Sequence, residues 1–321
     1  MIPEKKTMRD AFIEEVCKRM HTDERIFFVS ADFGAPTLDA LRSSFKERFI
    51  NVGIAEQNLI NVATGLGLEG FTVYAYAIAP FITMRAYEQI RTNLSLYAQL
   101  KEINVNLIGV GAGLSYDVSG PTHHCLEDII LMRTLPNLTV FSPSDWVLAQ
   151  KFVDYSIAER RPKYLRFDGK PVSGIYEVGS RVDLKTGFAE LRAGEKACIV
   201  STGYMTHTAL QAAQRLADEH INAGVIDIFM LKPIDDDTLF KSLAKYSHII
   251  TLEEGFIEKG GLDSLVAHVL EKNRATISLK RLGFQDRYVF DMGNRQQLHK
   301  LNRLDEENVA GIIREICGKL S

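Results

Sequence analysis

The sequence predicts an α/β protein made of two consecutive three-layer domains with mostly parallel sheets. Apolar runs of strand length alternate with amphipathic stretches of helix length along most of the chain, a pattern typical of parallel strands joined by helical crossovers. A loop-rich stretch at 168–183 separates two such series, and a length of 321 residues suits two domains. We therefore predict domains over residues 1–175 and 185–321, with the boundary near residue 180.

The first series contains strands and helices that we recognise from their hydrophobic period. The strands are predicted at Ile26–Ser30, Phe49–Val52, Thr72–Tyr76, Val105–Val110, Thr139–Ser142 and Tyr164–Phe167. The helices are predicted at 8–20, 55–68, 80–100, 124–134 and 144–159. Pro80 suits a helix start, because the N–H that proline lacks has no partner at that position.

The second series follows the same rule. Its strands are predicted at Ala197–Ser201, Ala223–Ile228, His248–Leu252 and Ile277–Leu282, and its helices at about 205–220, 236–245, 260–272 and 305–318. Parallel sheets bind ligands beyond the carboxyl ends of their strands. The loops that follow the predicted strands are therefore the places to look for a functional site.

Composition limits the class of protein. Hydrophobic residues at 46% and charged residues at 25% are ordinary for a globular chain. A net charge of −3 gives no sign of nucleic-acid or membrane binding. The amino-terminal stretch lacks the apolar segment of a signal peptide. The four cysteines have no CxxC spacing, so we expect a cytoplasmic, reduced protein.

Several well-known motifs are missing from the sequence. No GxGxxG follows a predicted strand, and the chain has no GxxxxGK[ST], HExxH or GxSxG motif. These absences argue against a free-standing dehydrogenase, a P-loop enzyme, a zincin and an α/β-hydrolase.

Glu56 has an unusual position, within the stretch FINVGIAEQNLINVATGLGLEG at 49–70. It lies where the predicted buried strand Phe49–Val52 enters a predicted helix of small and apolar residues. In one interpretation the acid complements the helix dipole, which is worth up to about 1 kcal/mol. In the other, Glu56 is a catalytic carboxylate in an apolar site.

Three further segments carry candidate functional residues. The segment from Tyr74 to Phe81 places aromatic rings at a strand end, either as core packing or to stack on a flat heterocycle. The Gly-rich loop GVGAGLSYDVSGPTHHCLED carries His123 and His124 near its end. Histidines in loops are often solvated or hydrogen-bonded without a functional role, so this pair alone is weak evidence of a site. Arg9 and Arg166 are either solvated side chains or phosphate ligands.

Together these segments resemble the transketolase family of thiamine diphosphate enzymes. The resemblance covers nearly the whole chain, with the landmarks in family order. They are SADFGAPT at 30–37, FINVGIAEQN at 49–58, PFITMRAYEQIR at 80–91, GPTHHCLEDIILMR at 120–133, PNLTVFSPSDW at 136–146 and VIDIFMLKPID at 225–235. The resemblance implies a pyrimidine-binding domain followed by the family's small C-terminal domain.

The resemblance also implies a partner chain. One-chain transketolases carry a further domain that holds the diphosphate and Mg²⁺ of the cofactor through a GDG motif, and this sequence has no GDG. We therefore expect the C-terminal subunit of a split transketolase. An N-terminal-type partner chain would hold the diphosphate and the Mg²⁺, with two copies of each chain in the complex, and no metal would bind here.

The family assigns roles to matching residues. In the matching IAEQ motif the glutamate hydrogen-bonds N1′ of the cofactor's aminopyrimidine, which implies that role for Glu56. The bond favours the imino tautomer, so that the 4′-nitrogen can take the C2 proton of a cofactor that works as a C2 ylid. Phe81 matches the ring that stacks on the pyrimidine, and Tyr76 is the second candidate. His123 matches a histidine near the reactive carbon of the substrate.

The resemblance extends to substrate binding but departs from the family at two positions. Arg9 and Arg166 lie where the family places phosphate-gripping arginines. Long transketolases have an aspartate where this chain has Ser119, and many have a histidine where it has Gly111. Loss of a charged partner relaxes discrimination between hydroxylated acceptors, which places the usual pentose phosphate substrates in question.

The resemblance implies transfer of a two-carbon ketol unit from a ketose or its phosphate to an aldose or its phosphate. One alternative is a protein similar to 1-deoxyxylulose-5-phosphate synthase or to the E1 β chain of 2-oxo-acid dehydrogenases. The other alternative is a non-catalytic scaffold chain. Activity with pyruvate as the donor distinguishes the first alternative, and loss of activity on changing Glu56 argues against the second.

Overall fold

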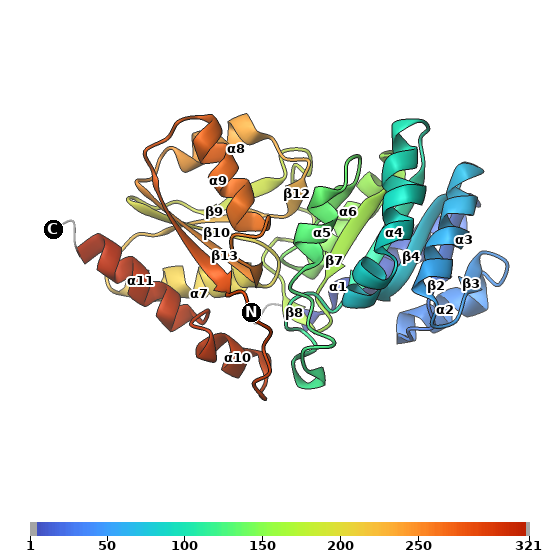
Figure 1. Cartoon of the computed structure of the whole chain (residues 1–321), viewed down its shortest axis with the longest axis horizontal. Coiled ribbons are helices and arrows are strands. Elements are labelled where there is room, and N and C mark those ends of the chain that lie inside the picture. Colours follow the sequence, from blue (N-terminus) through green and yellow to red (C-terminus); the bar gives the residue numbers. More distant parts are fainter. Residues whose placement is uncertain (1–4, 319–321) are drawn as a thin grey trace. The chain divides into compact units, whose positions relative to one another are not determined.

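The structure of the chain is a computed structural model that describes residues 5–318 (Figure 1). The chain divides into two compact units. Unit 1 contains the chain up to Ala112, with Leu131–Phe141 and Asp145–Ser180; unit 2 contains Gly113–Ile130, Ser142–Ser144 and the chain from Arg181 onward. The predicted class of two α/β domains with mostly parallel sheets is confirmed, whereas the exact domain bounds stay a prediction.

Unit 1 is built on a parallel sheet whose strands lie in the order β6-β7-β5-β4-β2-β3. Most residues of these strands are buried. A strand that is covered on both faces has a continuous run of apolar residues. Such runs are easy to recognise in the sequence, and the predicted strands therefore lie close to the observed ones. Their bounds are β2 Ile26–Ser30, β3 Phe49–Asn51, β4 Thr72–Ile78, β5 Asn104–Val110, β6 Thr139–Phe141 and β7 Lys163–Phe167.

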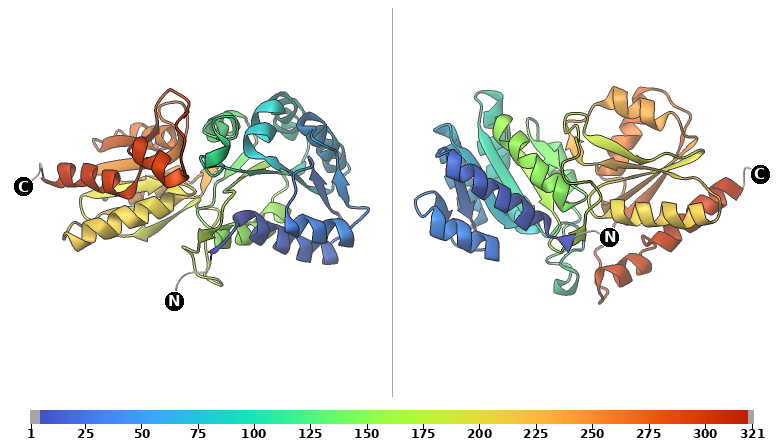
Figure 2. Two further views of the ribbon diagram at one scale, coloured as in Figure 1. Left: turned by 90° about the horizontal axis from the view of Figure 1, so that it is seen from below. Right: turned by 180° about the vertical axis from the view of Figure 1, so that it is seen from behind.

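Helices cover both faces of this sheet. Figure 2 shows α1 and α6, which pack against each other, on one face, and α3 with the segment after Pro80 on the other. The bounds are α1 Met8–Thr22, α2 Pro36–Ser44, α3 Glu56–Leu68, α5 Asp128–Thr134 and α6 Trp146–Ala158. A short antiparallel pair, β1 Lys5–Lys6 with β8 Val172–Ser173, was not predicted from the sequence.

The predicted helix at 80–100 is not one regular α-helix. It consists of the π-helix η1 at Phe81–Arg85, the α-turn α4 at Tyr87–Gln89, the π-helix η2 at Ile90–Leu96 and the 3₁₀ turn η3 at Tyr97–Gln99. The hydrogen bonds of a π-helix run from residue i to residue i+5, one residue further than in an α-helix, and so its period is longer. A search for a period of 3.6 residues therefore does not detect it.

Unit 2 has a sheet in the order β14-β13-β10-β11-β9, parallel except for the edge strand β9. Figure 1 shows α7 and α11 on one face and α8 and α9 on the other. The strands are β9 Phe188–Arg192, β10 Ala197–Ser201, β11 Gly224–Ile228, β13 His248–Phe256 and β14 Ser278–Phe284, and β12 lies at Met230–Lys232. The helices are α7 Met205–Asp218, α8 Asp236–Leu243, α9 Leu262–Lys272, α10 Arg295–Leu301 and α11 Glu306–Gly318.

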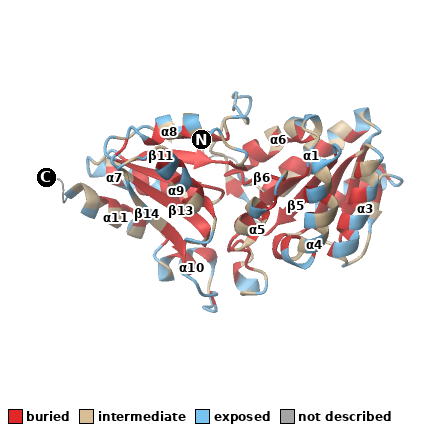
Figure 3. Ribbon diagram, turned by 45° about the horizontal axis from the view of Figure 1, so that its top comes forward, coloured by how far each residue is buried: buried red, intermediate tan, exposed pale blue. Residues whose placement is uncertain are grey.

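Burial follows the layers in each unit. Figure 3 shows the strands mostly buried and the outer sides of the helices exposed. The core of unit 2 joins apolar residues of its sheet to buried residues of α7 and α11. Within residues 5–318, no helix is both long enough and apolar enough to cross a membrane.

Candidate functional site

Glu56 is the first residue of α3 and only 2% of its surface is exposed. The chain reaches it through Gly53, whose φ of +74° is a conformation that glycine adopts without strain. The Asn51 side chain accepts a hydrogen bond from the Gly53 N–H at 3.0 Å and donates one to Asp32 at 2.7 Å. This bonded loop after β3 fixes the entry into α3 and so fixes the position of the carboxylate.

The Glu56 carboxylate forms an ion pair with Arg85. A guanidinium nitrogen of Arg85 lies 2.7 Å from Glu56 Oε2, and the Arg85 side chain is 49% exposed. The same guanidinium lies over the Phe81 ring, 4.8 Å from its centroid. Phe81 and Arg85 are the first and last residues of η1, so one short helix carries both the cation that pairs with Glu56 and the ring over which that cation lies.

Arg85 is the functional candidate that the sequence analysis missed. It lies four residues after Phe81 in the segment PFITMRAYEQIR, and residues with that spacing share one side of a helix. The spacing therefore indicated that Phe81 and Arg85 lie on the same side of the helix. It did not indicate that this side faces Glu56.

Tyr76 and Arg9 lie close together in unit 1. Tyr76 has no exposed surface, and its ring stacks on Phe33 with centroids 5.4 Å apart. Arg9 donates two hydrogen bonds to Asp10, at 2.9 and 3.0 Å. Burial alone would lower the pKa of Arg9, but its bonds to Asp10 and its interaction with Tyr76 outweigh burial and raise that pKa. Arg9 therefore remains positively charged.

Arg166 lies in β7 opposite Gly109 of β5 and is only 3% exposed. It is the last residue but one of its strand, close to the carboxyl end. The sequence analysis also placed Arg166 near the end of a strand. Ligands bind near the carboxyl ends of parallel strands, so this location suits a residue that contacts substrate.

Ser119 and His123 belong to unit 2, in the loop that follows Gly113. Ser119 ends the 3₁₀ turn η4 at Asp117–Ser119 and is exposed. Nδ1 of His123 lies 3.1 Å from the Thr122 hydroxyl, and its backbone N–H donates to the carbonyl of Gly120 at 3.0 Å. The predicted helix at 124–134 begins only at Asp128, because this loop continues through Cys125, which bridges to Gly113.

Asp117 holds this loop in place. Its carboxylate accepts hydrogen bonds from the backbone N–H groups of Val118 at 2.8 Å and Arg295 at 2.7 Å. His124 is buried beside it, with Nε2 3.3 Å from the carbonyl oxygen of Asp117, and burial lowers the pKa of His124. Asp117 and His124 therefore shape the loop that presents His123.

A buried charge cluster, also missed from the sequence, supports the same loop. Arg295 of α10 forms an ion pair with Glu254 of β13, and His299 Nε2 lies 2.5 Å from Glu254 Oε1. Burial would raise the pKa of Glu254, but the charge of Arg295 and the bonds from Arg295 and His299 hold that pKa far below its usual value. The Arg295 guanidinium also lies 3.5 Å from the centroid of the Tyr204 ring. The acid pair in TLEEGF, next to a predicted strand, was the only sequence signal.

The structure thus places the candidate residues in three groups, two in unit 1 and one in unit 2. Unit 1 joins Glu56, Arg85 and Phe81, and separately joins Tyr76 to Arg9. Unit 2 carries Ser119 and His123 on an anchored loop. Within residues 5–318, no group of three or more His, Cys, Asp or Glu side chains is arranged to hold a metal ion.

Comparison with known proteins identifies both units. A family model described as transketolase, pyrimidine binding domain, matches residues 4–170, and one described as transketolase, C-terminal domain, matches residues 188–309. One chain of the apulose-4-phosphate transketolase of Actinobacillus succinogenes is 33% identical over 273 residues, which cover 84% of this chain and 84% of that protein. A putative transketolase C-terminal section of Methanocaldococcus jannaschii is 32% identical over 313 residues, which cover 97% of this chain and 96% of that protein.

A solved structure agrees with these matches. It is a split-gene transketolase described as an inactive beta4 tetramer, and it is 32% identical with a TM-score of 0.85. The match covers 96% of this chain and 97% of that one. Enzymes with these domains depend on thiamine diphosphate, and the relatives, which are named as single subunits of split enzymes, imply an N-terminal-type partner chain. The chain therefore belongs to the transketolase family, as a C-terminal subunit of the split type.

Proposed function

We propose that this chain binds the pyrimidine end of thiamine diphosphate at Glu56 and Phe81, in a complex that transfers a two-carbon ketol unit between sugars. The observation that carries the proposal is the buried carboxylate at the start of α3, linked through Arg85 to an aromatic ring, within the matched pyrimidine-binding domain. In the same proposal, the N-terminal-type partner holds the diphosphate and the Mg²⁺.

The residues of unit 1 fit an aminopyrimidine ring. Such a ring needs a carboxyl group out of bulk water and an aromatic face. Glu56 is 2% exposed, and the partly buried Phe81 contacts the same Arg85 guanidinium as Glu56 does. A carboxyl group held out of bulk water can bond a ring nitrogen without competition from solvent. The fit concerns the pyrimidine end alone, because the diphosphate end is assigned to the partner.

Each residue of this chain has a proposed task. Glu56 exchanges a proton with N1′, and Phe81 stacks on the pyrimidine, with the buried Tyr76 as a second aromatic wall. When bound, thiamine diphosphate supplies the carbanion-stabilising centre that carries the two-carbon unit. Proton-transfer assistance by a well-placed carboxyl group is typically worth about 10²–10⁴ in rate.

The substrate contacts complete the proposal. His123 hydrogen-bonds the donor's carbonyl or hydroxyl oxygen, and the exposed Ser119 offers a neutral hydroxyl where long transketolases have an aspartate. Arg9 and Arg166 grip a phosphate at the far end of the substrate. A phosphorylated ketose is accordingly the first donor to test, and the name of the Actinobacillus relative agrees with this choice.

We also propose the assembly and location of the complex. Two copies of this chain and two of the partner form the active enzyme. The isolated chain is expected to be an inactive homo-oligomer, because a relative is described as an inactive beta4 tetramer. A cytoplasmic location is part of the proposal, and the four free cysteines agree with it.

The test is the variant Glu56→Gln in the complex reconstituted with the partner. The glutamine keeps the shape of the side chain but cannot exchange a proton, so ketol transfer should fall by about 10²–10⁴. The rate is measured with ketose phosphate donors and aldose acceptors, and pyruvate is included as an alternative donor. The matched control is Glu69→Gln, an exposed acid at the end of the same helix, which should leave the rate unchanged. Full activity in Glu56→Gln contradicts the proposal.

A further inference from the structure

The groups proposed for the pyrimidine ring are already in contact with another flat group. Arg85 donates to the Glu56 carboxylate at 2.7 Å, and its guanidinium lies 4.8 Å from the Phe81 centroid. A guanidinium is planar, donates hydrogen bonds in its plane and stacks on aromatic rings. Arg85 therefore makes the same two kinds of contact that an aminopyrimidine would make.

We propose that Arg85 is a gate at the pyrimidine end of the cofactor site, closed in the free chain and displaced when the cofactor binds. This inference rests on the proposed function, since it gives Glu56 and Phe81 the same ligand. It adds Arg85 as a residue that controls access to the site, and it gives a functional role to the ion pair between Arg85 and Glu56.

The closed gate and a bound pyrimidine ring compete for the same carboxylate. Glu56 Oε2 already accepts a hydrogen bond from Arg85 at 2.7 Å. A ring nitrogen that bonds this carboxyl group needs that place, so the ion pair with Arg85 must open before Glu56 can act.

The burial of the two partners shows which one moves. The Glu56 side chain is 3% exposed and fixed at the start of α3, whereas Arg85 is 49% exposed. An arginine that is half in water keeps much of its hydration when it swings outward, so Arg85 is the partner that moves. A buried carboxylate left without a partner is costly, so Arg85 holds Glu56 until the ring nitrogen replaces it.

The experiment compares Arg85→Gln with the wild type in the complex reconstituted with the partner, with thiamine diphosphate binding measured by calorimetry. Removing the competing cation should tighten binding by about two- to fivefold, the range expected for a partly exposed pair. Arg85→Lys keeps the competing charge and should bind close to wild type. The matched control is Arg42→Gln, because Arg42 also lies over a ring, Phe49 at 5.4 Å, and pairs with Asp39 of its own helix at 3.5 Å.

Salt gives a second readout that a structural role does not predict. Salt screens the exposed pair in the wild type and leaves nothing to screen in Arg85→Gln. The ratio of the two affinities should therefore approach one as ionic strength rises. Cofactor affinity that is unchanged or weaker in Arg85→Gln, while Glu56→Gln is inactive, overturns the gate and leaves the proposed function standing. An active Glu56→Gln removes the basis of both.

Discussion

Glu253 and Glu254 are neighbours in β13, and they have opposite surroundings because successive side chains of a strand point to opposite faces. Glu253 accepts hydrogen bonds from the backbone N–H groups of Leu262, at 3.0 Å, and Asp263, at 2.9 Å, at the start of α9. Glu254, on the other face, meets Arg295 and His299. One acid therefore holds a helix end, and the other neutralises a buried cation.

The buried pair predicts a pH-dependent stability. The pKa of Glu254 is held below its usual value in the folded chain, so Glu254 stabilises the fold fully above the usual glutamate pKa of about 4.3. That contribution is lost progressively as pH falls below this value toward the lower folded pKa. At neutral pH, Glu254→Gln should lower the free energy of unfolding by about 3–5 kcal/mol, because it leaves Arg295 buried without its counter-charge.

The measurement is denaturant unfolding of wild type and variant at several pH values. The difference between them should shrink in acid. Glu271→Gln, at an exposed acid of α9, is the control and should change little at any pH. A difference that grows as pH falls would contradict the assignment of Glu254.

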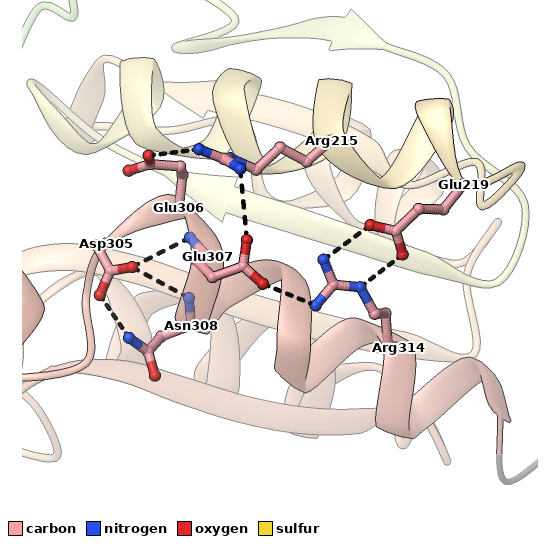
Figure 4. A network of polar contacts seen from close by, with 7 residues as sticks. All are labelled: Arg215, Glu219, Asp305, Glu306, Glu307, Asn308 and Arg314. Atoms are coloured by element: carbon pink, nitrogen blue, oxygen red, sulfur yellow. Dashed lines mark hydrogen bonds and ion pairs between the residues drawn. The ribbon is translucent and has the colours of Figure 1, made fainter.

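The helix α11 shows how an element is held by two kinds of contact. Figure 4 shows Arg215 of α7 bonded to Glu306 and Glu307, and Arg314 of α11 bonded to Glu219 and Glu307. Asp305 accepts bonds from the backbone N–H groups of Glu307 and Asn308 at 3.1 and 3.2 Å, and so supports the start of the helix. The same helix also has an apolar side, with Val309, Ala310 and Ile313 in the core of unit 2.

The apolar side should contribute most to stability. Ile313 is fully buried, and truncation of such a side chain costs about 2–5 kcal/mol, so Ile313→Ala should lower the free energy of unfolding by that amount. Arg314→Ala removes exposed ion pairs, which solvent screens. It should cost clearly less, and the loss should fall further in high salt. Equal losses in thermal or denaturant unfolding would contradict the larger contribution of the core.

At the scale of the whole molecule, the chain supplies only the residues for the pyrimidine and part of the substrate site in our proposal. The isolated chain should therefore show no ketol transfer. Activity should rise with added partner and stop rising at equimolar amounts, as expected for two copies of each chain. The measurement is a titration of activity at a fixed amount of this chain, with the mass of the complex determined in parallel. Turnover by this chain alone would contradict the division of the cofactor site.

Much of the fold could be predicted from the sequence. The strands Ile26–Ser30 and Ala197–Ser201 were predicted at their observed bounds, because a strand buried on both faces leaves an apolar run. The antiparallel edge strand β9, the short helix α10 and the π-turns after Pro80 were not predicted. Short or partly exposed elements leave a weak hydrophobic period, and π-turns have a different one.

By itself, the sequence determined the class of fold, the order of its parallel strands along the chain and the family, because these follow from local patterns and motif order. The tertiary structure alone decided the partners of the site residues. It paired Glu56 with Arg85, 29 positions away, and the Asp117 carboxylate with the Arg295 N–H, 178 positions away. Such contacts depend on how helices and loops pack around the sheets. Local periodicity carries no information on that packing.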